Sequence, residues 1–262
     1  VDTAAYSEVL AQAYVVTDAA DVDSDELAEA LARLESLPDR RGYVTEVFCE
    51  RARYFHPDNG VRIDAIREGI DDLFADHPLR PLRLAAPELT TGTGRAVRGD
   101  ALELAGTLDP VDLAYLDPPY NQHRYFTNYH VWETLVRWDA PEHYGVACKR
   151  VDAREAATRS PFNSRRTMPD ALAAVIAQVR AETMVVSFSN EGFVPLPELV
   201  EMCAVRGHPV EVLAFDTRRY IGQRLGVFNP DGRRVGVPGP ERNVEYVLIS
   251  APAEVQVALA TR

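Results

Sequence analysis

Residues 111–120 read Val-Asp-Leu-Ala-Tyr-Leu-Asp-Pro-Pro-Tyr, a mostly apolar stretch that runs into the tetrapeptide Asp117-Pro118-Pro119-Tyr120. The stretch from Val111 to Leu116 predicts a strand, and the Pro-Pro pair predicts the turn that ends it. The flanking sequence predicts further strands over 96–98, 184–188, 210–215 and 244–249, and helices over 169–181 and 195–206. Strands that alternate with helices predict an α/β fold with a mainly parallel sheet.

Polar clusters follow three of the predicted strands. They are Gly99-Asp100, Asp117–Tyr120 and the segment Ser187-Phe188-Ser189-Asn190. In open α/β sheets ligands bind at the carboxyl ends of the strands, so these clusters mark the expected ligand site.

The first 75 residues predict mostly helix. Ser24 is the expected N-cap of a helix whose Leu27, Leu31 and Leu34 share one face. A second apolar stripe follows an expected turn at Asn59-Gly60 and comprises Ile63, Ile66, Ile70 and Leu73. Residues 78–95 are rich in Pro, Gly and Thr and predict a loop.

Composition places the chain among globular proteins. The 262 residues are 46% hydrophobic and 26% charged, enough for one good core with a smaller appended lobe. No apolar run approaches the ~20 residues that cross a bilayer, and the N-terminus has no signal-like pattern. Cys49, Cys148 and Cys203 are isolated from one another in sequence, which argues against a disulfide framework or a zinc site. We therefore expect a cytoplasmic protein with no membrane contact and no metal.

The formal net charge of -12 is unusual for a protein that binds a polyanion. Basic residues nevertheless gather in two stretches, 149–166 and 216–242, while residues 1–30 carry only acids. Each stretch alone could be a solvated face. Because both follow the tetrapeptide, we expect them to form a contact surface.

The tetrapeptide suits chemistry on an exocyclic amino group. The lone pair of adenine N6 is delocalised into the ring, so acceptors aimed at its two N–H bonds favour the tetrahedral nitrogen. Asp117 offers a carboxylate and Pro118 a carbonyl that the two prolines hold in place. Tyr120 offers a flat face for a base flipped out of its stack. The alternative is a rigid Pro-Pro turn with a packed tyrosine.

Together with its surroundings, the tetrapeptide resembles that of the Dam-like (D12 class) adenine-specific DNA methyltransferases. The similarity extends to residues 42–45 with 54–64, to 187–190, and to 218–220 with 243–249. It implies a Rossmann-like S-adenosylmethionine-dependent methyltransferase sheet with a helical target-recognition insert. Residues 1–14 and 95–262 would form the catalytic domain, and 15–94 the mostly helical insert. The implied reaction is methyl transfer from S-adenosylmethionine to adenine N6 in double-stranded DNA, with a cognate restriction endonuclease as a second partner.

The resemblance also assigns roles to individual residues. Asp117, Pro118, Pro119 and Tyr120 would be catalytic. Asp2, Asp100 and Asp117 would bind the cofactor. Asp2 would bind the ribose hydroxyls, and Asp100 would lie beside the adenine. Residues 121–166 would cover the flipped base. The predicted target and DNA contacts are Tyr120, Asn128, Lys149, Arg150, Asn190, Arg218 and Arg219.

Each assignment has a structural alternative. Asp2 could be a frayed terminal residue, Asp100 a cap, and Asn190 a turn residue. Trp132 and Leu135 have helical spacing, which predicts that both pack inward.

One departure from the family bears on cofactor binding. Its members carry a Gly-containing strand-turn, upstream of the ribose-binding acid, that holds the methionine end of the cofactor. We find no counterpart here and expect the natural chain to be longer. Two alternatives stay open: a ribosomal RNA base N-methyltransferase, and a non-catalytic DNA-binding relative with an incomplete cofactor site.

Overall fold

The computed structural model describes residues 2–77, 80, 91–92, 94–218, 233 and 241–260. Contacts divide the chain into a first unit, Val1–Ala101 with Arg124–Arg159, and a second unit, Leu102–His123 with Ser160–Arg262. These packing units do not follow the predicted division into 1–14 with 95–262 and 15–94, which stays a prediction about function. Within the described ranges, no helix is long and apolar enough to span a membrane.

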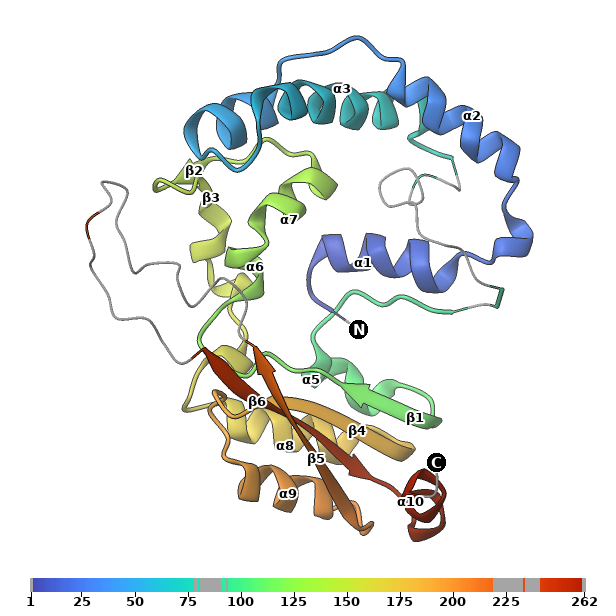
Figure 1. The fold of residues 1–262 in the computed structure, drawn as a ribbon, viewed down its shortest axis with the longest axis vertical. Helices are drawn as coiled ribbons and strands as arrows, with labels where there is room; N and C mark the ends of the chain where they lie inside the picture. Colours follow the sequence, from blue (N-terminus) through green and yellow to red (C-terminus); the bar gives the residue numbers. More distant parts are fainter. Residues whose placement is uncertain are drawn as a thin grey trace. The chain divides into compact units, whose positions relative to one another are not determined.

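The first unit is mostly helical, as predicted for residues 1–75 (Figure 1). Its elements are α1 (Ala5–Ala11), η1 (Gln12–Val16), η2 (Ala19–Asp21), α2 (Ser24–Glu35), η3 (Val44–Arg51), α3 (Pro57–Phe74), α6 (Tyr125–Asn128), α7 (His130–Arg137), η5 (Val151–Arg154) and η6 (Ala156–Thr158). A short antiparallel pair, β2 (His143–Tyr144) and β3 (Lys149–Arg150), also belongs to this unit.

Helix α2 begins one residue earlier than its expected cap implied. Its N-cap is Asp23, whose carboxylate accepts hydrogen bonds from the N–H groups of Asp25 and Glu26, so the prediction of Ser24 was wrong. Asp and Ser are comparable N-caps, and two adjacent candidates cannot be separated by residue type alone. The predicted apolar face is confirmed, since Leu34 is buried and Leu27 and Leu31 are half-buried.

The expected turn at Asn59-Gly60 was also wrong, because both residues lie inside α3. Pro57 takes the first helical position, where its missing N–H costs nothing. Gly60 is needed for close packing: a Cβ there would lie 2.4 Å from Cys49 Sγ and 3.1 Å from Thr45 Cα on η3. The glycine therefore allows two helices to approach closely.

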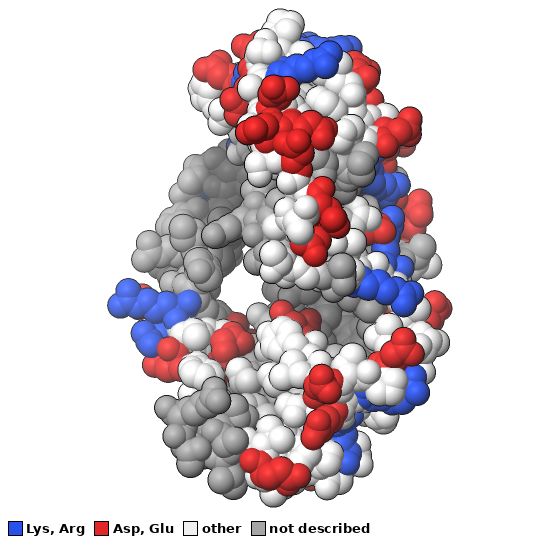
Figure 2. Space-filling view, turned by 90° about the vertical axis from the view of Figure 1, so that its right-hand side faces the viewer, with Lys and Arg blue, Asp and Glu red and all other residues white. Residues whose placement is uncertain are grey.

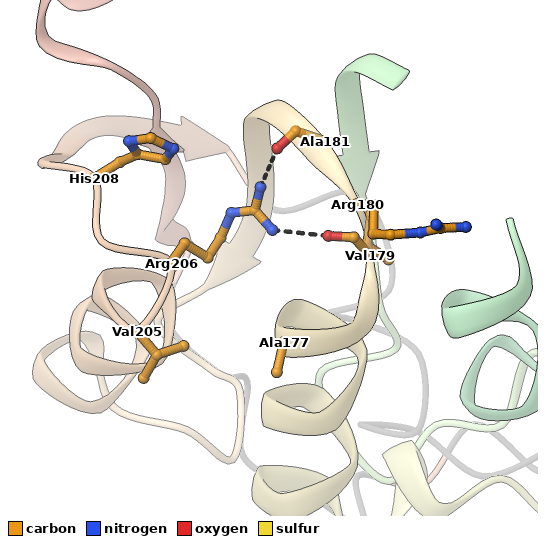
Figure 3. Close-up of a pocket in the computed structure, with 7 residues that line it drawn as sticks. All are labelled: Ala177, Val179, Arg180, Ala181, Val205, Arg206 and His208. Atoms are coloured by element: carbon orange, nitrogen blue, oxygen red, sulfur yellow. Dashed lines mark hydrogen bonds between the residues drawn. The ribbon is translucent and has the colours of Figure 1, made fainter. Parts of the chain in front are cut away.

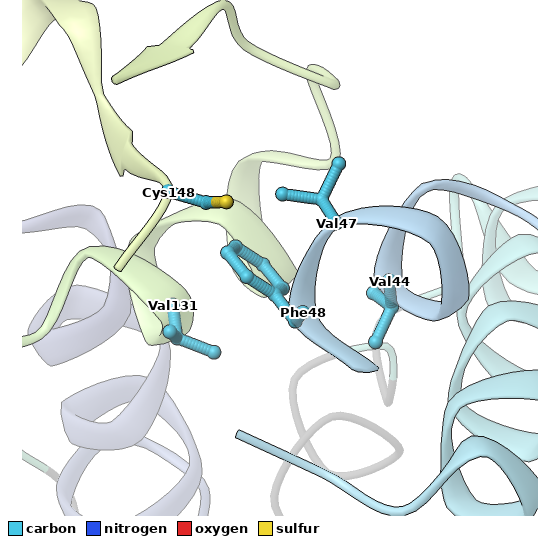
Figure 4. Close-up of a cluster of buried hydrophobic side chains, with 5 residues drawn as sticks. All are labelled: Val44, Val47, Phe48, Val131 and Cys148. Carbon is cyan, nitrogen blue, oxygen red and sulfur yellow. The ribbon is translucent and has the colours of Figure 1, made fainter. Parts of the chain in front are cut away.

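A small apolar cluster joins α7 to η3 (Figure 4). Its buried members are Val44, Val47, Phe48, Val131 and Cys148. Leu135 packs against it as predicted, whereas Trp132 is 53% exposed. The prediction for Trp132 was wrong because Val131, Thr134 and Leu135 define the inward face of α7.

The second unit contains a four-stranded sheet of order β1-β4-β6-β5. Its elements are η4 (Ala105–Thr107), β1 (Val111–Leu116), η7 (Pro161–Asn163), α8 (Met168–Gln178), β4 (Ala181–Ser189), α9 (Leu196–Ala204), β5 (Val210–Arg218), β6 (Arg242–Ser250) and α10 (Ala253–Ala260). Helix α5 (Ala101–Leu104) spans the boundary between the two units in the sequence. Every strand and helix predicted between 111 and 249 is confirmed.

The prediction that the sheet is mainly parallel was wrong. β1 and β4 are parallel, but β6 pairs antiparallel with both β4 and β5, so the sheet is mixed. Helix α9 connects β4 to β5, which run in the same direction, and β6 inserts between them in the opposite direction. The strand predicted over 96–98 is a single parallel bridge between Arg98 and Asp2.

Helices α8 and α9 cover one face of this sheet (Figure 1). Met184, Val186 and Phe188 alternate along β4 and are at most 1% exposed on that face. The next residues along the strand point to the opposite face, and Ser187 is one of them. This alternation decides which side chains can meet beyond the end of β1.

Candidate active site

The tetrapeptide follows β1 directly, at the carboxyl end of a parallel pair. The register pairs Leu116 with Val186, so Asp117 comes opposite Ser187. Two of the three predicted clusters, those at Asp117 and Ser187, therefore lie side by side at the ends of β1 and β4. Gly99-Asp100 follows the isolated bridge between Arg98 and Asp2 and is not part of this sheet.

Asp117 is exposed, and one of its oxygens has a fixed partner. The Ser187 hydroxyl donates to Asp117 Oδ1 at 2.9 Å. Tyr115 donates in turn to Ser187 Oγ at 3.0 Å. Asp117 Oδ2 makes no hydrogen bond to any described residue, which leaves an acceptor for an incoming N–H group.

The rest of the tetrapeptide is packed from behind. Pro118 is buried, and Pro119 and Tyr120 are half-buried. The Tyr120 ring meets Phe188 edge-on, with centroids 5.9 Å apart, and the Tyr120 carbonyl accepts from the Phe193 N–H at 2.9 Å. These contacts hold the backbone and orient the ring.

Sequence reasoning missed residues that support the turn after the tetrapeptide. Asn163 donates to the Asn121 and His123 carbonyls at 2.9 and 3.1 Å. The Arg165 guanidinium lies 5.3 Å from the centroid of the Phe193 ring. The Asn163 bonds join segments that are far apart in the sequence, and no local pattern signals them.

Asn190 follows β4 and extends its pairing with β6. Its N–H donates to the Val244 carbonyl at 2.9 Å, and its side-chain oxygen accepts from the Val244 N–H at 3.1 Å. This geometry favours the alternative in which the Asn190 side chain holds the backbone in place. A contact with the target base stays a prediction.

In the first unit, the structure brings together the two acids predicted to bind the cofactor nucleoside. Asp2 donates its N–H to the Val97 carbonyl at 3.3 Å, and its carbonyl accepts from the Gly99 N–H at 2.8 Å. Its backbone is therefore paired, against the frayed-terminus alternative. Asp100 comes two residues after Arg98, which forms a single parallel bridge with Asp2. Carboxylates suit the hydroxyls of a ribose as hydrogen-bond acceptors.

Arg150 is buried, contrary to its predicted role as a DNA contact. It is 1% exposed, and all five of its N–H donors are engaged, with Asp139, Asp152 and the Thr134 hydroxyl. Burial opposes the charged form, but the hydrogen bonds that Arg150 donates to Asp139 and Asp152 outweigh it and raise the pKa of Arg150. No N–H is left for a phosphate, so Arg150 is a structural residue and the prediction was wrong.

The other predicted DNA contacts are more open. Lys149 is half-buried on β3, and Asn128 is exposed at the end of α6. Arg218 is exposed at the end of β5, opposite Arg242, which is paired with Asp216 at 2.7 Å. Arg219 lies outside the described residues. The face in Figure 2 shows no continuous basic patch among the residues coloured there.

A cavity of about 440 Å³ opens beside Arg180, Arg206 and His208 (Figure 3). It includes Ala181, the first residue of β4, and so lies at the opposite end of that strand from Ser187. Arg206 donates to the carbonyls of Val179 and Ala181, and Val179 is the C-cap of α8. This arginine links the end of α8 to the start of β4, so we interpret the cavity as structural. The described residues hold no group of three or more His, Cys, Asp or Glu side chains arranged to bind a metal.

Comparisons with known proteins agree with the resemblance. A family model described as D12 class N6 adenine-specific DNA methyltransferase matches residues 71–165. The chain is 35% identical over 131 residues to the modification methylase LlaI of Lactococcus lactis subsp. lactis. It is 26% identical over 241 residues to the type II methyltransferase M.NlaIII of Neisseria lactamica, and 24% identical over 250 residues to M.CviAII of Paramecium bursaria Chlorella virus 1.

The matches differ in how much of each protein they span. The alignment with LlaI covers 49% of this chain but 19% of LlaI. Those with M.NlaIII and M.CviAII cover 75% and 79% of this chain, and 70% and 74% of those proteins. No solved structure matches the chain at a significant level. The resemblance stated from the sequence is confirmed.

Proposed function

This chain is related to the D12 class of N6 adenine-specific DNA methyltransferases, and we propose that it methylates the exocyclic N6 amino group of adenine in DNA. The observation that carries the proposal is the exposed Asp117 carboxylate at the carboxyl end of β1, with one oxygen engaged by Ser187 and the other open.

Each part of the tetrapeptide has a role in this reaction. Asp117 Oδ2 accepts one N6–H bond and the Pro118 carbonyl accepts the other, which exposes the nitrogen lone pair. Tyr120 stacks on the flipped adenine. Methyl transfer leaves N6 with four bonds and a positive charge, so one of its two protons is then readily lost to water and no strong base is required.

We propose S-adenosylmethionine as the methyl donor, as the family implies. When bound, it supplies an electrophilic methyl group. Asp2 would accept hydrogen bonds from ribose hydroxyls and Asp100 would lie beside the cofactor's adenine. The pairing of Asp2 with the segment before Asp100 supports this assignment.

Double-stranded DNA is the proposed substrate, with Asn128, Lys149, Asn190, Arg218 and Arg219 as candidate contacts. Because the relatives are named modification methylases and type II methyltransferases, a cognate restriction endonuclease and a cytoplasmic location form part of the proposal. The proposed domains remain a Rossmann-like catalytic part, 1–14 and 95–262, and a target-recognition insert, 15–94.

Radiolabelled methyl transfer to adenine-unmethylated phage DNA tests the proposal. We expect N6-methyladenine in the product with the wild-type chain. Asp117→Ala should lower the rate by about 10²–10³-fold or more, an effect comparable to losing an oxyanion-hole donor. The fold should be unchanged, because Asp117 is exposed in a loop.

Three other outcomes would contradict the proposal. An Asp117→Ala variant with near-normal turnover would remove the catalytic role of the tetrapeptide. Methylation of ribosomal RNA but not DNA would favour the RNA alternative. DNA binding without any transfer would favour the non-catalytic relative.

A further inference from the structure

Asp117 is held by a hydroxyl relay on the face of the sheet opposite α8 and α9. The relay runs from Tyr115 to Ser187 and from Ser187 to Asp117 Oδ1, with oxygen separations of 3.0 and 2.9 Å. We propose that Ser187 is a positioning residue, oriented by Tyr115, that sets the rotation of the Asp117 carboxylate. The inference rests on the proposed function and adds two residues to its machinery.

The strand register explains why these three residues meet. Tyr115 and Asp117 are two residues apart, so their side chains point to the same face. β4 pairs in parallel with β1, with Tyr115 opposite Val185 and Leu116 opposite Val186. Ser187 therefore comes opposite Asp117 on the same face, and Tyr115 reaches it as a diagonal neighbour.

The Asp117 carboxylate needs a hydrogen-bond donor such as Ser187 to stay oriented toward the amino group. Rotation about the last side-chain bond exchanges Oδ1 and Oδ2, and an exposed carboxylate samples many orientations. A donor on Oδ1 selects the orientation in which Oδ2 is left for the amino group. Preorganised acceptors of this kind stabilise the transition state without reorganising during the reaction.

The donor and acceptor roles along the relay agree with a chain of hydrogen bonds that ends on Asp117. The Ser187 hydroxyl has a single proton and donates it to Asp117 Oδ1. The Leu116 carbonyl is a more distant acceptor, 3.5 Å from Ser187 Oγ. Ser187 Oγ keeps its lone pairs, and the Tyr115 hydroxyl donates to them. Tyr115 thereby favours the Ser187 rotamer that points at Asp117.

Because its side chains are exposed, we expect the relay to contribute little to the free energy of folding. The Tyr115 side chain is 59% exposed and Asp117 is exposed as well. Hydrogen bonds in such positions compete with water and contribute little to stability. A residue that serves only the fold would be better placed on the buried face beside Met184 and Val186.

Steady-state methyl transfer to adenine-unmethylated phage DNA, together with Tm, tests the inference. Ser187→Ala should lower kcat by about 10–100-fold, the range expected for losing a hydrogen bond to a charged group. KM for DNA and Tm should stay near the wild-type values. Ser187→Thr keeps a hydroxyl on the same β-carbon and should restore most of kcat.

Tyr115 is tested by a double-variant cycle. Tyr115→Phe should lower kcat about fivefold in the wild-type background. It should have no further effect when Ser187 is already Ala, because Tyr115 acts only through that hydroxyl. Thr183→Val is the matched control: Thr183 lies on β4, opposite Leu113 and well before Ser187, so kcat should not change.

The possible failures are distinct. A wild-type chain that transfers no methyl to DNA overturns the proposed function and the relay together. An active wild type with an equally active Ser187→Ala overturns the relay alone. A loss of kcat that follows a loss of Tm, without rescue by Thr, makes Ser187 a folding residue and also overturns the relay.

Discussion

At the scale of single residues, the geometry separates side chains that face a substrate from side chains that hold the fold. Tyr120 and Arg150 were both predicted to contact DNA. Tyr120 is half-buried, with its backbone and ring edge held by Phe193 and Phe188. Arg150 is enclosed by carboxylates. We therefore expect substitutions at the two positions to affect different properties.

Substitution of Tyr120 tests the stacking role. Tyr120→Phe keeps the flat ring, so methyl transfer should be close to normal. Tyr120→Ala should weaken the complex with the flipped base by about 1–3 kcal/mol, the contribution of one stacked base. The measurement is kcat/KM for both variants on phage DNA. Equal values for Phe and Ala would make Tyr120 a purely structural residue.

Substitution of Arg150 tests the structural role of that guanidinium. Arg150→Met leaves Asp139 and Asp152 without their buried partner, and we expect a loss of about 2–4 kcal/mol in the free energy of unfolding. Urea denaturation measures it. Arg166→Met, at an exposed arginine, is the control and should change stability by less than about 0.5 kcal/mol. Comparable stability in the two variants would contradict the burial of Arg150.

At the scale of elements, two close contacts bring other helices of the first unit against η3. Gly60 lets α3 lie against η3, and His130 on α7 lies beside Phe48 of η3. The imidazole is 1% exposed, and its Nε2 lies 3.4 Å from the Tyr54 hydroxyl. Both contacts require a helix, α3 or α7, to lie close to η3.

Gly60→Ala should push α3 away from η3, because the added carbon would lie 2.4 Å from Cys49 Sγ. Overpacking of this kind costs about 1–3 kcal/mol, and thermal unfolding should show a lower Tm. Gly106→Ala is the matched control, since the nearest atom to its Cβ would be 3.5 Å away. An unchanged Tm for Gly60→Ala would mean that the two helices can separate at little cost.

His130 makes the stability of the first unit depend on pH. Burial, together with the positive charges of Lys149 and Arg150, lowers the pKa of His130 to about 4. In the unfolded chain the imidazole takes up a proton near pH ~6.5, so between these two values the unfolded state binds more protons. Stability should therefore fall as pH decreases from about 6.5 to 4, by about 3 kcal/mol from this residue.

The comparison with His130→Phe isolates that contribution. Urea denaturation at several pH values between about 7 and 4 should show a shallower loss of stability in the variant than in the wild type. The pH-dependent difference should vanish above about pH 7, where the imidazole is neutral in both states. Parallel curves would mean that His130 is accessible to solvent protons in the folded protein.

At the scale of the whole molecule, charge is the feature that fits the proposed function least well. The chain has a net charge of -12, yet its proposed substrate is a polyanion. In the first unit Arg67 bonds to the carbonyls of Leu135 and Val136, and Arg62 bonds to those of Leu37 and Glu35. These arginines therefore serve the fold. Of the two basic stretches, 149–166 contains the buried Arg150, so 216–242 is the stronger candidate for a DNA face.

Neutralising Arg218, Arg219, Arg233 and Arg234 tests that stretch. DNA binding should weaken, and the slope of log affinity against log salt should shrink by about 0.9 for each phosphate that the variant no longer neutralises. The measurement is a salt titration of binding to duplex DNA. Neutralising the exposed Arg180, which lies just before β4 at the end of that strand away from Ser187, is the control and should leave the slope unchanged. An unchanged slope in the fourfold variant would make 216–242 an ordinary solvated surface.

The amino-acid sequence by itself determined the features that depend on neighbours in the chain. Residues 111–116 form a strand ended by Asp117-Pro118, and the elements from α8 to β6 lie where apolar runs and breakers predicted them. Such runs reflect burial and backbone preference, which are local properties. The tetrapeptide and its surroundings were also sufficient to show the resemblance to the D12 class, whose family model matches residues 71–165.

The tertiary structure alone decided which segments meet. The antiparallel insertion of β6, the pairing of Asp2 with the segment before Asp100, and the enclosure of Arg150 each depend on packing beyond the local sequence. The placement of Ser187 against Asp117 depends on the register between β1 and β4. A local pattern can show that a side chain is polar or charged, but its partner is selected by packing free energy summed over the whole core. The rotation of the Asp117 carboxylate is therefore a property of the folded sheet and cannot be read from the tetrapeptide.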